Sequence, residues 1–481
     1  MTSYLKFDPQ SSEQIAQHGL TFEWCASLFL GGTKFESIPT LLQGISAEQK
    51  QFAVRQTLAT DTIYLSLQQQ RLSVADPWAA GKRCEALACL TADKQDSLPY
   101  EMLPIYYGCK SENGEQFWVC VYSTCGVVTQ AFFPSRDLVI FDVSRVNAES
   151  VVGSLQSFLS RYSEQVAELV ARVGRPAKCV GLLDMVTNFG HQAINHLSGI
   201  QRIVDFGLLG NIDEVWACGT LFFGRVELLF PELNGRVRYF SSRWEIAGHL
   251  LREPCQLIRI GSTYLSSKLR DRIARKVRPA ADRIRSNLLV VTLRAAGRTC
   301  VNLPDVVGEL YERLRKNCDF KIALDGWVLP ESSIVAASSV GAAISSQYVD
   351  AIRNEMALAR EIERKLPPGV IIANTIGRSM FESLDDLAVA TCYFSHVGTL
   401  QHKLGLLLRL PGVVHGPKLQ LAAPEGGPYL SEDGMSPIFV PQNAVEDAPS
   451  TPIRGQSFAD YRIVDLAFIT ESLARLMRPP V

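Results

Sequence analysis

Histidines are concentrated in two short segments of this chain. Five of the seven lie either in residues 182–196, "LLDMVTNFGHQAINH", or in residues 393–417, "YFSHVGTLQHKLGLLLRLPGVVHGP". They are His191, His196, His396, His402 and His415. Imidazole is the side chain that most readily gains or loses a proton near neutral pH, and it is also a common metal ligand. The two segments are therefore the first places to look for a site.

Metal binding is the less favoured explanation for these histidines. Zinc ligands usually recur at short spacings such as HxxxH, whereas His191 and His196 are five residues apart and would lie on different helix faces. The twelve cysteines are scattered, without a CxxC pair, which is typical of reduced thiols in a cytosolic protein. We predict no metal site and no bound cofactor.

The second segment carries a group of residues suited to a diphosphate. Glycine allows backbone amides to approach a ligand, the first turn of a helix favours an anion, and lysine adds a positive charge. The group comprises Ser395, His396, Gly398, Thr399, His402 and Lys403. The histidines could instead hydrogen-bond loop carbonyls, and His415, at the end of the next strand, is equally compatible with function and with structure.

Three more charged residues are candidates for the same ligand. Arg294 and Arg298 flank Gly297 just after a predicted strand, and two guanidinium groups there can hold phosphate oxygens; a solvated loop is the alternative. Glu382 lies on a predicted helix shortly before the second histidine segment, where a carboxylate can accept ribose hydroxyls. Its role stays open.

Strands and helices alternate around these residues. Predicted strands at 287–293, 320–325, 369–373, 391–395 and 412–415 are separated by helices at 303–316, 345–365, 379–390 and 399–410. A similar alternation begins near residue 151, so both halves predict parallel sheets with crossover helices. Ligands of such sheets bind beyond the carboxyl ends of the strands, which is where both histidine segments fall.

The fold class is therefore α/β, with two Rossmann-like domains facing each other across a cleft. The expected regions are a mixed α+β segment (1–150), the two Rossmann-like domains (151–285 and 286–420), a Pro/Gly-rich extended loop (421–456) and a C-terminal helix (457–481). Ser457 is placed to cap that helix, which we expect to cross back over the domains.

Charge and hydropathy narrow the class of protein. The chain has 481 residues and a net charge of −1, which gives no electrostatic case for nucleic acid binding. We find no signal peptide and no apolar run of about 18 residues, so we expect a cytoplasmic protein. Residues 268–285, "KLRDRIARKVRPAADRIR", are strongly basic; a solvated helix is the simpler explanation, and peripheral contact with the inner face of a membrane is the other.

The order of motifs resembles a known enzyme family. "NFGHQAINHLSGIQRI", "VVTLRAAGRTCVNLPDVVGELYERL" and "ESLDDLAVATCYFSHVGTLQHKLGLL" follow the layout of bacterial capsular-polysaccharide-type glycosyltransferases, whose family includes xylosyl- and N-acetylglucosaminyltransferases. These have an N-[FY]-x-H segment, then an arginine-rich strand end, then an "HGAGLTN"-like loop. Here the loop reads "SHVGTLQHK", which shifts the small residues and adds His402 and Lys403. The resemblance covers about residues 178–417.

The resemblance implies a GT-B fold and a metal-independent transfer of a sugar from a nucleotide-sugar to an acceptor hydroxyl. Residues 151–285 would then hold a glycan or lipid-linked acceptor, and residues 286–420 the donor. His191 or Asp184 would deprotonate the acceptor, and His396 or His415 would assist the leaving phosphate. The alternatives are a sugar-nucleotide epimerase or hydrolase of the same architecture, and a non-catalytic partner in glycan assembly.

Overall fold

The structure is a computed structural model, in which 12 segments of the chain are described. They are residues 2–30, 64–92, 102–142, 144–171, 178–185, 188–253, 255–279, 287–295, 297–333, 339–422, 437–448 and 459–477. The described residues form an α/β protein with three main sheets, of which the second and third are largely parallel. The predicted α/β class is confirmed.

The first sheet is built from seven strands that are mostly antiparallel, with only β1 running parallel to its neighbour. In spatial order they are β1 (Ser3–Lys6), β7 (Leu138–Phe141), β6 (Val128–Phe133), β5 (Gln116–Val121), β4 (Ile105–Lys110), β3 (Arg83–Thr91) and β2 (Ser73–Ala75). One face packs on α4 (Arg145–Arg161) and α5 (Ser163–Ala171) through residues such as Phe158. These two helices, most of which we had assigned to the second region from sequence, therefore pack on the first sheet.

The second sheet packs directly on the other face of the first. Its parallel strands are, in order, β10 (Val237–Phe240), β9 (Glu214–Leu221), β8 (Cys179–Met185) and β11 (Gln256–Arg259), and β14 (Ser332–Ser333) pairs antiparallel with β9. Leu182 and Trp216 of this sheet share a core with first-sheet residues and with α1 (Ser12–Gln17) and α2 (Phe22–Leu30). Its own helices are α6 (Phe189–His191), α7 (Ser198–Asp205), α8 (Val226–Leu229), α9 (Arg243–Arg252) and α10 (Ser267–Ala274).

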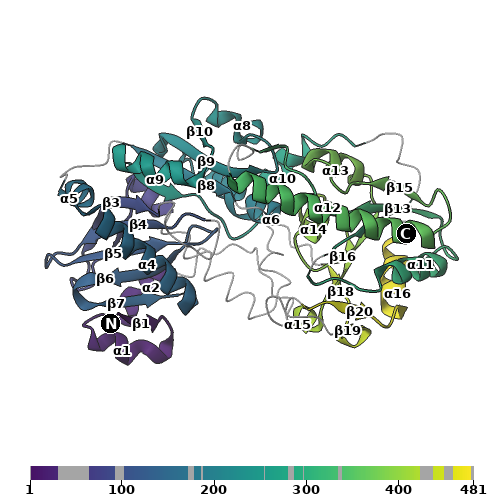
Figure 1. Cartoon of the computed structure of the whole chain (residues 1–481), viewed down its shortest axis with the longest axis horizontal. Coiled ribbons are helices and arrows are strands. Elements are labelled where there is room, and N and C mark those ends of the chain that lie inside the picture. The colour runs from purple at the N-terminus through teal and green to yellow at the C-terminus, as the bar shows by residue number, and fades with distance from the viewer. Residues whose placement is uncertain are drawn as a thin grey trace.

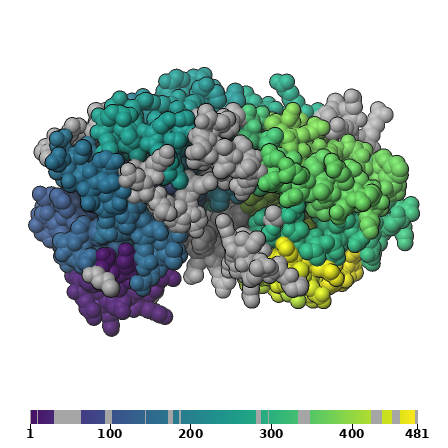
Figure 2. Space-filling view, in the orientation of Figure 1, coloured from purple at the N-terminus to yellow at the C-terminus, as the bar shows by residue number. Residues whose placement is uncertain are grey.

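The third sheet has six parallel strands. Their order is β15 (Ile371–Asn374), β13 (Phe320–Asp325), β12 (Asn287–Thr292), β16 (Cys392–His396), β17 (Gly412–His415) and β18 (Ile438–Phe439). The helices of this part are α11 (Leu303–Leu314), α12 (Ser339–Lys365), α13 (Met380–Leu387), α14 (Thr399–His402), α15 (Lys418–Ala422) and α16 (Ala467–Met477). Figure 1 shows the first and third sheets at opposite ends of the molecule, with the second sheet between them. Figure 2 shows the same order in colour, with purple and blue atoms at one end and green and yellow atoms at the other.

The C-terminal segment differs from the prediction. A strand, β20 (Tyr461–Ile463), pairs with β19 (Val445–Asp447), and the helix α16 begins only at Ala467. The backbone N–H of Ala467 donates to the Asp465 carboxylate at 2.8 Å, which supports the helix start. Ser457, the predicted cap, lies outside the described residues. The region 421–456, expected to be an extended loop, includes the short strands β18 and β19.

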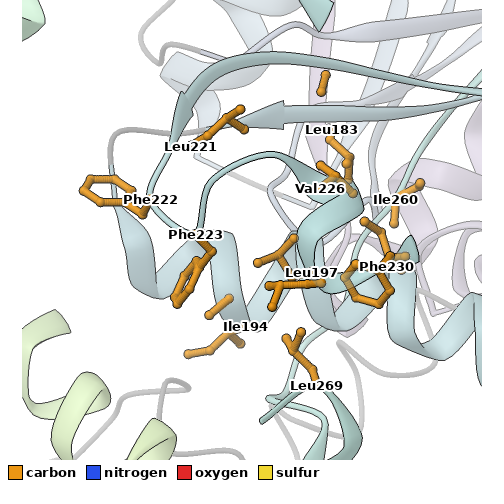
Figure 3. Close-up of a cluster of buried hydrophobic side chains, with 14 of the residues drawn as sticks. Leu183, Ile194, Leu197, Leu221, Phe222, Phe223, Val226, Phe230, Ile260 and Leu269 are labelled. Atoms are coloured by element: carbon orange, nitrogen blue, oxygen red, sulfur yellow. The ribbon is translucent and has the colours of Figure 1, made fainter. Parts of the chain in front are cut away.

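One hydrophobic core joins the second and third sheet regions. Leu183, Ile194 and Phe222 of the second region (Figure 3) belong to the same buried cluster as Met380 and Leu400 of the third. Burying a side chain of this size stabilises a protein by about 1.5–3 kcal/mol. The contact therefore holds the helices of the two parallel-sheet regions in a fixed relation. Among the described helices, none is both long enough and apolar enough to cross a membrane.

Candidate functional site

The two histidine-bearing segments meet where α6 and α14 lie side by side (Figure 1). The Asn188 side-chain amide, just before α6, donates to the Thr399 hydroxyl at 3.0 Å. A Cβ atom added to Gly190 would lie 3.0 Å from the Thr399 methyl and 3.1 Å from Nδ1 of His402. The turns that follow β8 and β16 are therefore in direct contact.

Local sequence explains how each turn begins its helix. The Asn188 carboxamide oxygen accepts from the backbone N–H groups of Gly190 and His191, at 2.8 and 3.4 Å, and so caps α6. Gly398 has a φ of 140°, which side chains rarely tolerate, and it precedes α14. Both helices continue as π-helical segments, Gln192–Leu197 and Lys403–Leu407. Such segments frequently accompany functional sites.

Two arginines converge on the second turn. A Cβ atom at Gly398 would lie 3.4 Å from Nη1 of Arg294 and 3.6 Å from Nη2 of Arg298. Burial lowers the pKa of Arg294 to about 10, and the positive charge of Arg298 adds to this effect. Arg298 also has a left-handed φ of 59°, a conformation that costs about 1–3 kcal/mol in residues other than glycine. An anion at this position would relieve the repulsion between the two guanidinium groups.

The contact between the turns brings together several of the residues singled out from sequence. His191 is exposed, and Arg294, Arg298, Gly398 and Thr399 are partly exposed. His402 lies beneath them, where burial, followed by the charges of His191 and Arg298, lowers its pKa to about 3. The exposed part of this group thus combines an imidazole, two guanidinium groups and a hydroxyl.

Lys403 does not belong to this exposed group, contrary to our expectation. Its side chain is fully buried, and Nζ donates to the Asp325 carboxylate at 2.5 Å and to the Ser383 hydroxyl at 2.9 Å. Asp325 also accepts from the Thr375 hydroxyl at 2.6 Å. Burial lowers the pKa of Lys403, and Asp325 opposes that shift. The lysine is engaged inside the third region and is not placed to bind a diphosphate.

His396 and Ser395 are likewise buried beneath the turn. The Thr292 hydroxyl donates to the Ser395 hydroxyl at 2.8 Å and lies 3.1 Å from Nδ1 of His396. Burial, followed by the charge of Arg294, holds the pKa of His396 well below its ordinary value. His396 is therefore neutral at physiological pH and cannot protonate a leaving phosphate, which is one of the two ways in which we expected it to assist; the other is a hydrogen bond, and the ring is buried.

His415 serves to pack the third region. Its Nδ1 lies 2.7 Å from the Tyr461 hydroxyl of β20, and its ring stacks on Phe394 at a centroid distance of 4.3 Å. Burial lowers the pKa of His415 to about 3. His196, the second histidine of the first segment, is also fully buried, and burial lowers its pKa to about 3. Neither imidazole carries a charge that could bind a phosphate at neutral pH.

The two carboxylates singled out from sequence are engaged elsewhere. Asp184 is buried, pairs with Arg259 at 3.5 Å and accepts from the backbone N–H of Leu103, so it faces the first sheet. Glu382 caps its own helix, because its carboxylate accepts from the backbone N–H of Ser379 at 3.0 Å. We therefore leave Asp184 out of the proposed catalytic group and Glu382 out of the proposed donor site.

Glu355 of α12 is a buried acid that sequence analysis did not single out. Its carboxylate accepts from the backbone N–H of Trp327 at 2.6 Å. Burial raises its pKa from 4.5 to about 7; the nearby charge of Asp325 adds to this, whereas Arg294 and Lys403 oppose it. A glutamate within a helical pattern gives no sign of such burial, so only the fold reveals it.

The raised pKa of Glu355 predicts a pH-dependent stability. Between its unfolded and folded pKa values, the folded protein keeps a proton that the unfolded chain has lost. The stabilisation that this retained proton gives the folded protein is therefore complete below the unfolded pKa of Glu355, and it is lost as the pH rises through about 7. It amounts to about 3 kcal/mol. Glu355→Gln is expected to be increasingly more stable than the parent from about pH 5 to pH 8 in urea unfolding. An unchanging difference would contradict this, and Glu361→Gln, exposed on the same helix, is the control.

Asn195 is a further residue that sequence analysis did not single out, and Asn188 entered it only as the first residue of the N-[FY]-x-H segment. Asn188 joins the two turns, and Oδ1 of Asn195 lies 2.9 Å from Nδ1 of His191. Asparagine at a helix start is a known capping signal and could have predicted the capping role of Asn188. Among the described residues, no group of histidine, cysteine or acidic side chains is arranged to hold a metal ion.

Comparisons with known proteins identify no family for this chain. No family model matches it, and no curated protein matches it. A crystal structure of accessory secretory protein 1, 2 and 3 in Streptococcus pneumoniae contains a chain with a TM-score of 0.20 and 9% identity. The match covers 68% of this chain and 66% of that chain, just under two thirds of its length. A similarity this low carries no argument, so the resemblance to capsular-polysaccharide-type glycosyltransferases rests on the motifs alone.

Proposed function

We propose that this protein is a glycosyltransferase with a GT-B arrangement of its two parallel-sheet regions, and that it uses a nucleotide-sugar donor. The observation that carries the proposal is the contact between the turn at Asn188 and the turn at Thr399, beside the converging pair Arg294 and Arg298. Such a contact offers a general base from one region and a phosphate-binding pair from the other, which is what glycosyl transfer requires.

In this proposal Arg294 and Arg298 bind the diphosphate of the donor. Guanidinium groups form charge-assisted hydrogen bonds to phosphate oxygens, and they would stabilise the charge that grows on the leaving nucleoside diphosphate. Gly398 leaves room for close approach, and the Thr399 hydroxyl can donate to a phosphate oxygen. No step of this scheme calls for a cofactor or a metal ion.

His191 is the proposed general base. The acceptor oxygen forms a bond to the anomeric carbon as the bond from that carbon to the phosphate oxygen breaks. The hydroxyl proton moves to the imidazole of His191, and the nucleoside diphosphate leaves with the bonding electrons. His191 is exposed and has the one imidazole of the two segments that is not buried, so it can reach an acceptor.

The acceptor is proposed to be a glycan or a lipid-linked precursor, handled in the cytoplasm or at the inner face of the membrane. The basic segment that begins at Lys268 would attract an anionic acceptor or surface. Within its described part, Lys268 pairs with Asp205 at 2.8 Å and Arg272 with Glu232 at 2.5 Å. Arg270 is buried and pairs with Asp271 at 3.7 Å. The attraction would therefore come from the exposed residues Arg275, Lys276 and Arg278.

Calorimetric titration with a panel of UDP-, GDP-, CMP- and TDP-sugars tests the proposal. One nucleotide should bind, and Arg294→Gln or Arg298→Gln should weaken that binding by about 10- to 100-fold, as expected for a lost charged hydrogen bond. Arg315→Gln, at an exposed arginine of the third region, should change nothing. Turnover of a nucleotide-sugar without any acceptor would favour a sugar-nucleotide epimerase or hydrolase. Failure to bind any nucleotide would favour a non-catalytic partner in glycan assembly.

A further inference from the structure

We propose that Asn195 is a positioning residue that holds the His191 ring in the tautomer with its proton on Nδ1 and a lone pair on Nε2. The inference rests on the proposed function only in assigning a catalytic use to that lone pair. The tautomer itself follows from hydrogen bonds among the described residues.

The orientation of the Asn195 side chain is determined by its donors. Asn195 is 5% exposed and lies in the π-helical segment one turn after His191. Its Nδ2 group donates to the backbone carbonyl oxygen of Ser262 at 2.6 Å and to the sulfur of Cys125 at 3.3 Å. A carbonyl oxygen can only accept, so the amide nitrogen must face Ser262 and the amide oxygen must face the other way.

That orientation leaves one choice for the His191 ring. Oδ1 of Asn195 lies 2.9 Å from Nδ1 of His191 and has no proton to offer. Nδ1 must therefore carry the proton that makes this hydrogen bond. A neutral imidazole has a single N–H, so Nε2 keeps its lone pair. Nε2 is the atom that would accept a proton from an acceptor hydroxyl.

A turn of the first sheet contacts the segment that holds the Asn195 side chain. Cys125 lies in the turn between β5 and β6, and Ser262 follows β11 of the second sheet. A Cβ atom at Gly261 would lie 2.0 Å from the carbonyl oxygen of Cys125, and one at Gly126 would lie 2.9 Å from the carbonyl oxygen of Arg259. Only glycine permits two backbones to approach this closely. The N-terminal region therefore helps to fix Asn195, which gives residues 1–150 a part in the site.

The tautomer can be measured directly by NMR. Protein labelled with ¹⁵N-histidine would be studied at alkaline pH, where imidazoles are neutral, and the His191 signals would be assigned by their loss in His191→Gln. The parent protein should show a protonated Nδ1 and an unprotonated Nε2. In Asn195→Ala the Nε2–H form should become the major one, whereas Asn195→Asp, which retains an acceptor oxygen, should restore the Nδ1–H form. A merely structural role predicts no such restoration, because a carboxylate facing the Ser262 carbonyl disturbs packing more than alanine does.

The same variants separate the inference from the proposed function. In a transfer assay, Asn195→Ala should lower kcat by about 10-fold with little change in the KM of the donor, and Asn195→Asp should recover part of the loss. An Nε2–H tautomer in the parent protein would overturn the inference whatever the activity. If the parent showed the Nδ1–H form but transferred no sugar, the tautomer assignment would stand and the proposed function would fail.

Discussion

Replacing Lys403 with methionine is expected to lower the free energy of unfolding by about 3–5 kcal/mol, because it leaves a buried carboxylate without its countercharge. Lys403 and Asp325 are both fully buried, and their charged atoms are 2.5 Å apart. Methionine has nearly the same length, so the loss of charge dominates over the loss of packing. Chemical denaturation at neutral pH would measure the change.

Two controls make the Lys403 prediction specific. Adding Asp325→Asn to Lys403→Met removes the orphaned charge and should recover more than half of the lost stability. Lys365→Met breaks an exposed pair with Asp305 and should cost at most about 1 kcal/mol. If Lys403→Met stayed as stable as the parent protein but lost nucleotide binding, Lys403 would be a ligand contact and our description of it would be wrong.

Replacing His191 with alanine is expected to lower kcat by about 10²- to 10⁴-fold, the range that a general base contributes. The donor dissociation constant and the melting temperature should stay close to those of the parent protein, because His191 is exposed and the proposed donor contacts come from other residues. Steady-state kinetics with saturating donor and acceptor would measure the loss. Added imidazole should restore part of the activity in the alanine variant.

His18→Ala is the matched control for this measurement. His18 is a partly exposed histidine that follows α1, far along the chain from both turns. The His18→Ala substitution should leave kcat unchanged. A His191→Ala protein that keeps at least half of the parent kcat would remove His191 from the reaction and leave the site without its proposed base.

Much of the fold can be predicted from hydrophobic pattern, because strands buried in parallel sheets read as short apolar runs. The predicted strand 412–415 coincides with β17, and the predicted strand 320–325 coincides with β13. The start of the C-terminal helix could not be predicted, because Tyr461–Ile463 forms a strand by pairing with β19. The packing of α4 on the first sheet is also a tertiary fact that an amphipathic pattern leaves open.

The site could be predicted only in part. The carboxyl-end rule for parallel strands drew attention to two turns that the structure places in contact, and to the arginine pair near Gly398. The direction of each side chain depends on partners distant in sequence. Lys403 meets Asp325, 78 positions away, and His415 meets Tyr461, 46 positions away. Residue type and spacing do not predict such pairings between distant positions. The sequence therefore could not distinguish the buried imidazoles from the exposed one.

A crystal structure with a bound nucleoside diphosphate tests the central claim most directly. We predict that the diphosphate lies beside Gly398, within hydrogen-bonding distance of Arg294 and Arg298. The side of the diphosphate that the arginines do not contact should face His191. Density for the diphosphate in another part of the protein, with both guanidinium groups free of it, would contradict the account.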